Sequence, residues 1–458
     1  MNTQGDLRKL PSVDRLLQTE RLSSLIQEHG RGLVVETTRE VLELTREAIR
    51  AGAPAPSEAE LAAAVARALH AALEPTLRRV INATGVIIHT NLGRSPLSQA
   101  ARQYMADACL VFSNIDYDLE AGRRGSRYVH AEELLRRLTG AEAALVVNNN
   151  AGAVLLTLTA LARGREVIIS RSQLIEIGGG FRIPEVMAQS GARLVEVGTT
   201  NRTRISDYEN AITEETAALM RAHHSNFRII GFTEEPALEE LVELGRRRNL
   251  PVIDDLGSGT LLDTAPYGLE HEPTVQESLR AGAALVTFSG DKLLGATQAG
   301  IIVGKAELVA RLRRFPLTRA LRVDKVTLAG LQATLLHYLQ GEALEQIPVW
   351  RMIARPAEEL KAVARDWAGK LRRRGLPASV VAGKSTVGGG SLPGATLPTW
   401  HVALDVASPD EMARRLRAGR PAVMAIIQEG RLLIDPRTVQ AGEEEMLLAA
   451  LERAFDSD

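Results

Sequence analysis

One lysine stands where an apolar, strand-like run ends in small residues. The run Val286-Thr287-Phe288 is followed by Ser289-Gly290-Asp291 and then by Lys292. Ligands of doubly wound α/β sheets bind outside the carboxyl ends of the strands, so this position predicts an amine that faces a binding crevice. A partly desolvated lysine amine deprotonates readily and can form a Schiff base. Taken alone, the pattern is more typical of a solvated lysine.

A second strand-like run ends in carboxylates. Residues 251–253 lead directly into Asp254 and Asp255, which predicts acidic side chains at the same sheet edge as the lysine. Pyridoxal 5′-phosphate needs this pair, because the lysine forms an imine while a carboxylate keeps the pyridine nitrogen protonated. One of the two aspartates can instead cap the following turn.

A third motif fits the phosphate of such a cofactor. The strand-like residues 144–147 lead into a turn of small and amide residues and then into the apolar helix predicted over 154–161. A helix start offers free N–H groups and a positive dipole end to a phosphate. We therefore expect Asn149, Asn150, Ala151 and Gly152 to bind the cofactor, although Asn also caps helices. Pyridoxal-phosphate enzymes of the aspartate-aminotransferase fold type use these three motifs in this order.

The elements around the motifs predict three pieces. Residues 1–72 read as a helical domain, 73–335 as a catalytic α/β domain and 336–458 as a C-terminal α+β domain. The predicted N-terminal helices cover 13–28, 33–51 and 57–72, with Ser57 and Glu60 forming a capping box. Strands are predicted at 144–147, 166–169, 193–197, 228–232, 251–253, 284–288, 401–406 and 423–427.

Composition limits the class of protein. The 458 residues include 45% hydrophobic and 24% charged residues, which is typical of an ordinary globular chain. The single cysteine, Cys109, cannot form a disulfide within one chain. The net charge of -1 gives no whole-chain sign of nucleic-acid binding. Without a membrane-length apolar run or a signal peptide, we expect a cytoplasmic protein.

Two motifs suggest other chemistry and are rejected. Residues 378–385 end in Gly-Lys-Ser like a phosphate-binding P-loop, but alanine stands where the first glycine belongs. His223 and His224 are adjacent, so their side chains would not share a metal-facing side, and no metal site is expected.

The chain as a whole resembles the bacterial selenocysteine synthases, the L-seryl-tRNA(Sec) selenium transferases. The blocks that carry the resemblance run in order along nearly the whole sequence: 10–14 (LPSVD), 79–85 (RVINATG), 89–94 (HTNLGR), 122–127 (GRRGSR), 148–151 (NNNA), 175–184 (IEIGGGFRIP), 197–203 (VGTTNRT), 255–259 (DLGSG) and 288–295 (FSGDKLLG). So many ordered blocks are far more specific than any one motif.

The resemblance implies a role for each matching residue. Lys292 would hold the cofactor, Asp255 would bind the pyridinium, and the 148–152 turn would bind the phosphate. Arg94, Arg319 and Arg322 would converge on an anionic group, expected to be selenophosphate, for which guanidinium donors are well suited. Spacing alone equally allows the last two arginines to be a solvated helix face.

Two further residues are considered for supporting roles in the site. Asp291 would orient the lysine or support the arginines, or would be only a turn residue. Gln173 is a weak candidate for the residue that stacks on the cofactor ring.

The resemblance also implies a reaction and partners. Seryl-tRNA(Sec) would lose its Cα proton and its hydroxyl to give a cofactor-bound aminoacrylyl group, which selenium from selenophosphate attacks to give selenocysteyl-tRNA(Sec). The lysine amine is expected to move the proton. Residues 1–72 would bind tRNA, although their charges are roughly balanced. Dimers would assemble into a larger ring, such as a decamer.

Two alternatives stay open at this point. One is a pyridoxal-phosphate lyase or transferase that acts on a small amino acid or amino sugar, because a fold does not determine its substrate. The N-terminal extension argues against it, since relatives of that kind tend to lack one. The other is a non-catalytic tRNA-binding relative, against which the intact Lys292 and Asp255 argue.

Overall fold

The chain divides into two compact units, Met1–Arg79 and Val80–Asp458. A computed structural model describes residues 3–177 and 180–456. In this part of the chain no helix is both long and apolar enough to cross a membrane.

The first unit consists of short helices around a small core of its own. They are α1 (Thr3–Arg8), α2 (Val13–Leu17), α3 (Glu20–His29), α4 (Arg31–Arg50) and α5 (Glu58–Leu73). Leu16, Leu22, Val34 and Leu69 fill the core. The single helix expected over 13–28 is broken, because Thr19 is the N-cap of α3 and its hydroxyl bonds back to the Leu16 carbonyl at 2.7 Å.

The predicted capping box at the start of α5 is present. The Glu60 carboxylate accepts the Ser57 backbone N–H at 2.7 Å, and the Ser57 hydroxyl accepts the Glu60 N–H at 3.3 Å. Each partner satisfies a backbone donor that a helix start leaves free.

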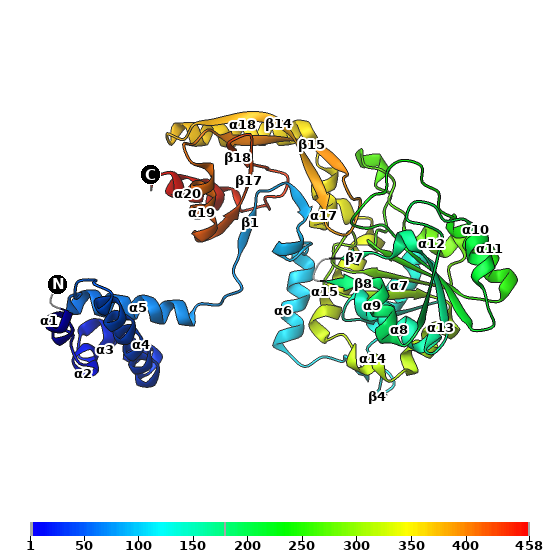
Figure 1. Ribbon diagram of the computed structural model, residues 1–458, viewed down its shortest axis with the longest axis horizontal. Helices are drawn as coiled ribbons and strands as arrows, with labels where there is room; N and C mark the ends of the chain where they lie inside the picture. The colour runs from blue at the N-terminus through cyan, green and yellow to red at the C-terminus, as the bar shows by residue number, and fades with distance from the viewer. Residues whose placement is uncertain (1–2, 178–179, 457–458) are drawn as a thin grey trace. The chain divides into compact units, whose positions relative to one another are not determined.

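A seven-stranded sheet dominates the described part of the second unit (Figure 1). In spatial order its strands are β5 (Ala143–Val147), β13 (Gly300–Gly304), β12 (Leu285–Ser289), β11 (Val252–Gly257), β10 (Thr216–Ala222), β6 (Glu166–Ser170) and β9 (Arg193–Val197). Only β13 runs antiparallel to its neighbours in this sheet. The prediction of a mostly parallel α/β sheet is therefore confirmed.

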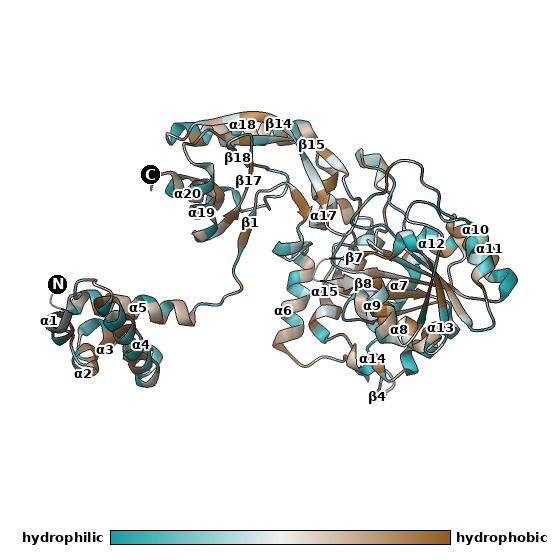
Figure 2. Cartoon of the chain, in the orientation of Figure 1, coloured by the Kyte–Doolittle hydropathy of each residue, from teal (hydrophilic) through white to brown (hydrophobic). Residues whose placement is uncertain are grey.

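Alternate residues of each strand enter two different cores. On β12, Val286 and Phe288 join one core, whereas Leu285 joins the other. The first core is covered by α7 (Val129–Thr139), α10 (Ile205–Ala211), α11 (Leu238–Arg248), α12 (Val275–Ala281) and α15 (Lys325–Gln340). The second is covered by α8 (Asn150–Ala162), α9 (Ile183–Ser190) and α13 (Ala306–Arg314). Because both faces are covered, the strands are largely apolar, and most of the sheet appears brown in Figure 2.

One strand prediction is wrong. Residues 228–232 form no strand, and the strand β10 lies earlier, at Thr216–Ala222. The side chains of Ile230 and Phe232 are 91% and 84% exposed, so this apolar run belongs to a surface loop. Apolar composition alone does not separate a buried strand from an exposed apolar loop.

A second sheet forms the C-terminal part. Its order is β17 (Ile426–Gln428), β18 (Arg431–Ile434), β15 (Thr396–Leu404), β14 (Ala378–Gly388) and β2 (Val86–Ile88), while β1 (Val80–Asn82) pairs with β16 (Ala422–Met424). Packed with it are α18 (Ala357–Arg373), α19 (Pro409–Ala418) and α20 (Glu444–Asp456). Residues 80–88, which the sequence places with the catalytic domain, thus pair with strands beyond residue 378.

The remaining described elements are short or connect the two sheets. They are α6 (Gln99–Leu110), α14 (Leu317–Ala320), α16 (Ala343–Gln346), α17 (Pro348–Ala354), the hairpins β3 (Tyr117–Asp118) with β4 (Arg123–Arg124) and β7 (Glu176–Ile177) with β8 (Phe181–Arg182), and the 3-10 turns Thr90–Leu92, Arg171–Gln173 and Ala265–Tyr267. Helix α6 packs against α15.

Candidate active site

Lys292 lies at the end of β12 in a cavity of about 190 Å³. Its side chain is buried, and this burial, followed by the nearby charge of Arg94, lowers the pKa of the amine. The Ser95 hydroxyl contacts the Lys292 carbonyl at 2.7 Å. A methyl group added at Gly390, whose φ is +89°, would lie 2.5 Å from Lys292 Cε, so this glycine lets the loop after β14 pack directly on the lysine.

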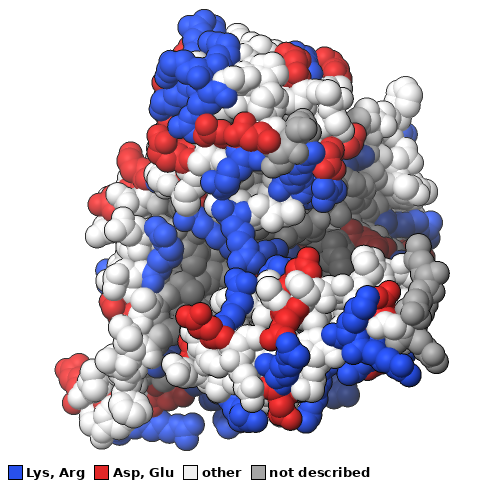
Figure 3. Space-filling model, turned by 90° about the vertical axis from the view of Figure 1, so that its left-hand side faces the viewer, with Lys and Arg blue, Asp and Glu red and all other residues white. Residues whose placement is uncertain are grey.

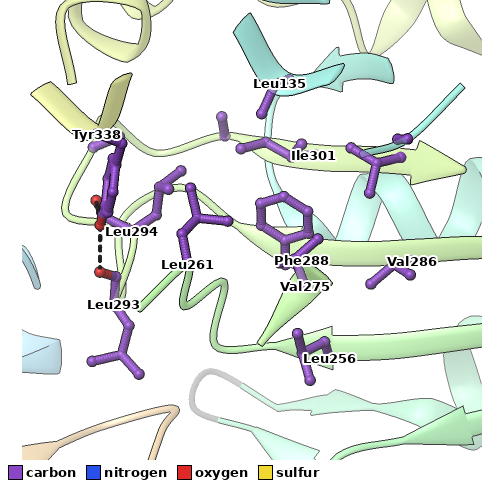
Figure 4. Close-up of a cluster of buried hydrophobic side chains, with 14 of the residues drawn as sticks. Leu135, Leu256, Leu261, Val275, Val286, Phe288, Leu293, Leu294, Ile301 and Tyr338 are labelled. Carbon is purple, nitrogen blue, oxygen red and sulfur yellow. Dashed lines mark hydrogen bonds between the residues drawn. The ribbon is translucent and has the colours of Figure 1, made fainter. Parts of the chain in front are cut away.

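The turn that carries the lysine is anchored in the hydrophobic core, where Leu293 and Leu294 lie beside Tyr338 (Figure 4). Leu293 and Leu294 are fully buried there. The hydroxyl of Tyr338 donates to their carbonyls at 3.3 and 3.0 Å and accepts the indole N–H of Trp350 at 2.7 Å. The lysine therefore projects from a turn that packing and hydrogen bonds hold in place.

Asp255 lies in the same cavity, on the neighbouring strand β11. Its Oδ1 accepts the Asn150 amide at 2.8 Å and the Thr287 hydroxyl at 2.9 Å, which leaves Oδ2 for a further donor. Burial raises the pKa of the carboxyl, and these two hydrogen bonds oppose the rise. A cationic donor in the cavity would favour the ionised form.

Asp254 faces the other side of β11. Its two carboxylate oxygens each accept a guanidinium N–H of Arg221 at 2.8 Å, and its side chain is fully buried. Because side chains alternate along a strand, only one of the two neighbouring aspartates can face the cavity. Asp254 is thus a structural ion-pair partner and does not cap the turn.

The expected phosphate turn forms the start of α8. Asn149 is the N-cap, and its side-chain oxygen accepts the Gly152 N–H at 2.8 Å. Asn149, Asn150 and Ala151 line the cavity, whereas the Gly152 N–H is taken up by the cap. The buried side-chain oxygen of Asn150 has no hydrogen-bond partner among the described residues. The N–H groups at the helix start can donate to the oxygens of an anion, and the free Asn150 oxygen can accept a hydrogen bond from the same ligand.

Arg94 and Asp291 meet at the rim of the cavity. Nη1 of Arg94 lies 2.9 Å from both carboxylate oxygens of Asp291, and the Gln298 amide approaches the same carboxylate at 3.4 Å. Arg94 has a φ of +63°, a left-handed conformation that is uncommon outside glycine. Such strain concentrates at functional sites. Asp291 is therefore an ion-pair partner of Arg94 in this structure.

The other two arginines do not line the cavity. Arg319 is exposed on α14, and Arg322 forms an isolated β-bridge with Val147, the last residue of β5. Between them, Leu321 contacts the phosphate turn, because its carbonyl accepts the Asn148 N–H at 3.0 Å. Within one chain, the 319–322 segment therefore contacts the phosphate turn through its backbone. The guanidinium groups of Arg319 and Arg322 do not reach the lysine cavity.

Sequence reasoning missed a pair formed by a half-buried histidine and a buried carboxylate. His223 lines the lysine cavity, and its Nδ1 lies 3.7 Å from Oε1 of the buried Glu272. Burial lowers the pKa of His223 to about 4 and raises that of Glu272 to about 7. Neither atom has a hydrogen-bond partner in the described part of the chain. The adjacent histidines could have flagged the site, but no pattern identifies a partner 49 residues away.

Three lesser expectations have clear outcomes. Gln173 does not line the cavity, since its side-chain oxygen accepts the Ala222 N–H at 3.0 Å, and it carries no ring-stacking role here. Residues 378–385 lie inside strand β14 and form no P-loop. Among the described residues, no group of three or more His, Cys, Asp or Glu side chains is placed to hold a metal ion.

Comparison with known proteins identifies the family. Residues 80–440 match the family described as L-seryl-tRNA selenium transferase, and residues 7–46 match the selenocysteine synthase N-terminal family. The chain belongs to the L-seryl-tRNA selenium transferase family. L-seryl-tRNA(Sec) selenium transferases from Geobacter sulfurreducens and Moorella thermoacetica are 49% and 50% identical to it; the matches cover 97% and 100% of this chain and 98% of each relative.

The fold is that of the fold type I pyridoxal-phosphate enzymes. A solved D-glucosaminate-6-phosphate ammonia-lyase superposes with a TM-score of 0.60 at 22% identity, covering 85% of this chain and 98% of the lyase. Pyridoxal phosphate is the cofactor that this family and fold imply. The residues present fit it, because a buried amine, a free carboxylate oxygen and a helix start face one cavity.

Proposed function

We propose that this L-seryl-tRNA selenium transferase family member converts L-seryl-tRNA(Sec) to L-selenocysteyl-tRNA(Sec), with selenophosphate as the selenium donor. The family match to both units supports the substrate, and the shared cavity of Lys292 and Asp255 supports the chemistry. The shared cavity is the observation that carries the catalytic part of the proposal. A non-catalytic relative would have no need to keep a buried amine and carboxylate together.

The protein's residues would hold and use pyridoxal phosphate as follows. Lys292 would hold its aldehyde carbon, Asp255 its ring nitrogen, and the start of α8 at Asn149, Asn150 and Ala151 its phosphate, with Gly152 shaping the turn. The bound cofactor supplies an electron sink for charge that develops at the substrate Cα. The lowered pKa of Lys292 favours the neutral amine, which can then take the Cα proton.

Three arginines are proposed to bind the selenium donor. Arg94 lines the lysine cavity, Arg322 pairs with Val147 at the end of β5, and Leu321, which lies between Arg319 and Arg322 in the sequence, contacts the phosphate turn. Several guanidinium groups suit a tetrahedral oxyanion. An incoming oxyanion would compete with Asp291 for Arg94, so Asp291 would hold the arginine in place before the donor binds.

The larger organisation is proposed on the family's pattern. The helical unit 1–79 would bind tRNA, because the selenocysteine synthase N-terminal family matches inside it. The charges of residues 1–72 are roughly balanced, so recognition would rest on shape and a few contacts. Figure 3 shows the distribution of charged side chains over one face of the structure, on which Lys and Arg gather in some places and Asp and Glu lie between them. The chain would form homodimers that assemble into a ring, and the enzyme would work in the cytoplasm.

The testing experiment is a visible absorption spectrum of the holoenzyme, followed by product analysis. We expect the cofactor band to change on addition of seryl-tRNA(Sec) but not of free L-serine, and selenocysteyl-tRNA to form once selenophosphate is added. Lys292→Ala should remove both responses. A wild-type band that responds to free serine and yields no selenocysteyl-tRNA would contradict the proposal and favour a small-molecule enzyme.

A further inference from the structure

We propose that a second cavity beside the lysine cavity binds the 3′-terminal nucleoside of the tRNA acceptor end. This cavity, here called the loop cavity, has a volume of about 480 Å³ and is lined by His223, His224, Phe227, Arg228, Ile230 and Leu392, among others. The inference deepens the proposed function and rests on it. In the substrate, an ester joins the seryl group to the terminal ribose, so that nucleoside must lie directly beside the lysine cavity.

The two cavities share a wall. His223 lines both, and Glu272, its buried neighbour, lines the loop cavity. Oε1 of Glu272 lies 3.7 Å from Nδ1 of His223, the residue that the two cavities share. A seryl group whose α-amine reaches Lys292 would therefore place its ester close to His223, with the ribose and base continuing into the loop cavity.

The loop cavity offers an aromatic surface for a base. The rings of His224 and Phe227 lie 4.8 Å apart at an interplanar angle of 60°. His224 is held by a contact of its Nε2 with the Ser172 carbonyl at 3.0 Å, and Phe227 packs against the second core of the sheet. Single-stranded RNA ends are bound by stacking of unpaired bases on Phe, Tyr, Trp or His rings.

One of the exposed apolar residues of the surface loop lines the same cavity, and another lies just outside it. Ile230 lines it while its side chain is 91% exposed, and the side chain of Phe232, two residues on, is 84% exposed. Large apolar side chains that are left uncovered mark interaction sites. This is the segment whose apolar composition predicted a strand, so a binding role explains why apolar residues stand in a loop.

The charges of the loop cavity favour a base over a phosphate group. Both guanidinium ends of Arg228 bond to Glu270, and His271 bonds to Asp263 and Glu277. Glu272 remains as a buried carboxyl. The cations are thus matched by carboxylates, which leaves stacking and hydrogen bonding as the means of recognition.

A rival cavity also adjoins the lysine cavity. It has a volume of about 810 Å³ and shares Arg94, Asp291 and Gln298 with the lysine cavity. No aromatic side chain is among the described residues that line it, and its charged groups are the Arg94–Asp291 pair and Asp324. It therefore lacks a surface on which a base can stack.

The test measures how much the terminal nucleoside contributes to binding. The dissociation constant of holoenzyme and deacylated tRNA(Sec) is determined with intact tRNA and with tRNA that lacks its 3′-terminal adenosine. For the wild type we expect removal of the adenosine to weaken binding roughly 5- to 100-fold, which corresponds to the stacking of one base. In Phe227→Leu, which keeps an apolar side chain but loses the ring, this factor should fall toward one. Phe227→Tyr should keep it.

A matched control probes the rival cavity. Leu97→Ala removes an apolar group from that cavity. The ratio of the dissociation constants measured without and with the terminal adenosine should stay as in the wild type. If Phe227→Leu and the wild type show the same factor, or if Leu97→Ala abolishes it, the assignment is overturned. Formation of selenocysteyl-tRNA by the wild type is measured separately. If the enzyme forms no product but its binding of the terminal adenosine still depends on Phe227, the proposed function is refuted and the binding site is not.

Discussion

Two adjacent aspartates in the site have opposite environments. Asp255 faces the lysine cavity, and Asp254 is fully buried against Arg221 on the other side of the strand. The two residues are chemically identical and differ only in which face of the sheet they occupy. Their substitution by asparagine therefore separates a catalytic from a structural carboxylate.

At the residue scale, we expect Asp255→Asn to lower turnover by a factor on the order of 10² or more, since it removes one charge from the active site. Cofactor binding and thermal stability should persist. Asp254→Asn should instead lower the free energy of unfolding by about 3 kcal/mol, because Arg221 would be left buried without its counter-charge. Turnover at substrate saturation and urea unfolding measure the two effects. Equal losses of turnover in both variants would contradict the assignment.

We expect the buried Glu272 to make the stability of the protein depend on pH. Burial raises its pKa to about 7 from 4.5, so between these values the folded protein binds more protons than the unfolded chain. The contribution of Glu272 to the free energy of unfolding therefore falls as pH rises through this window. Glu272→Gln should remove the fall and gain stability over the wild type from pH 5 to 8, by up to about 3 kcal/mol.

The control for this prediction is Glu270→Gln, a change two residues away at a more exposed carboxylate paired with Arg228. It should leave the pH dependence as in the wild type. The lowered pKa of His223, about 4, has the opposite sign, because it makes stability rise with pH between about 4 and 6.5. That contribution is common to wild type and control. Parallel stability curves for Glu272→Gln and wild type would show that Glu272 is ionised throughout.

At the element scale, the turn after β12 depends on α15. Tyr338 bonds to the carbonyls of Leu293 and Leu294 and to the indole of Trp350. We expect Tyr338→Phe to lower the free energy of unfolding by about 1–3 kcal/mol, because these buried groups lose their partner. Tyr104→Phe, at an exposed tyrosine on α6, should change it by less than about 0.5 kcal/mol. Equal effects in chemical denaturation would argue against a role for the hydroxyl.

At the scale of the whole molecule, the separate core of residues 1–79 predicts that this unit can be removed. A chain that begins at residue 80 should keep its cofactor absorption band, since the residues of the lysine cavity lie in the second unit. Its affinity for tRNA(Sec) should fall at least about tenfold, the change expected for loss of 1.4 kcal/mol of contacts. A binding titration with unchanged affinity would refute the tRNA-binding role.

Short-range patterns in the sequence were enough to predict the local parts of the site. A strand followed by small residues and Lys292, a strand that ends in two aspartates, and an Asn-rich turn before a helix are short-range patterns, and the structure places all three at one cavity. The mostly parallel sheet followed from the same alternation of elements. The prediction of a strand at 228–232 was wrong because apolar composition does not show whether other elements bury a segment.

The contacts between groups that lie far apart in the sequence became known from the folded structure alone. The structure assigned Asp254 to Arg221, paired His223 with Glu272, kept Arg319 and Arg322 out of the lysine cavity and joined β1 and β2 to the C-terminal strands. These contacts link residues from tens to hundreds of positions apart. Their geometry depends on strand register and on the packing of both sheet faces, which no short stretch of sequence encodes.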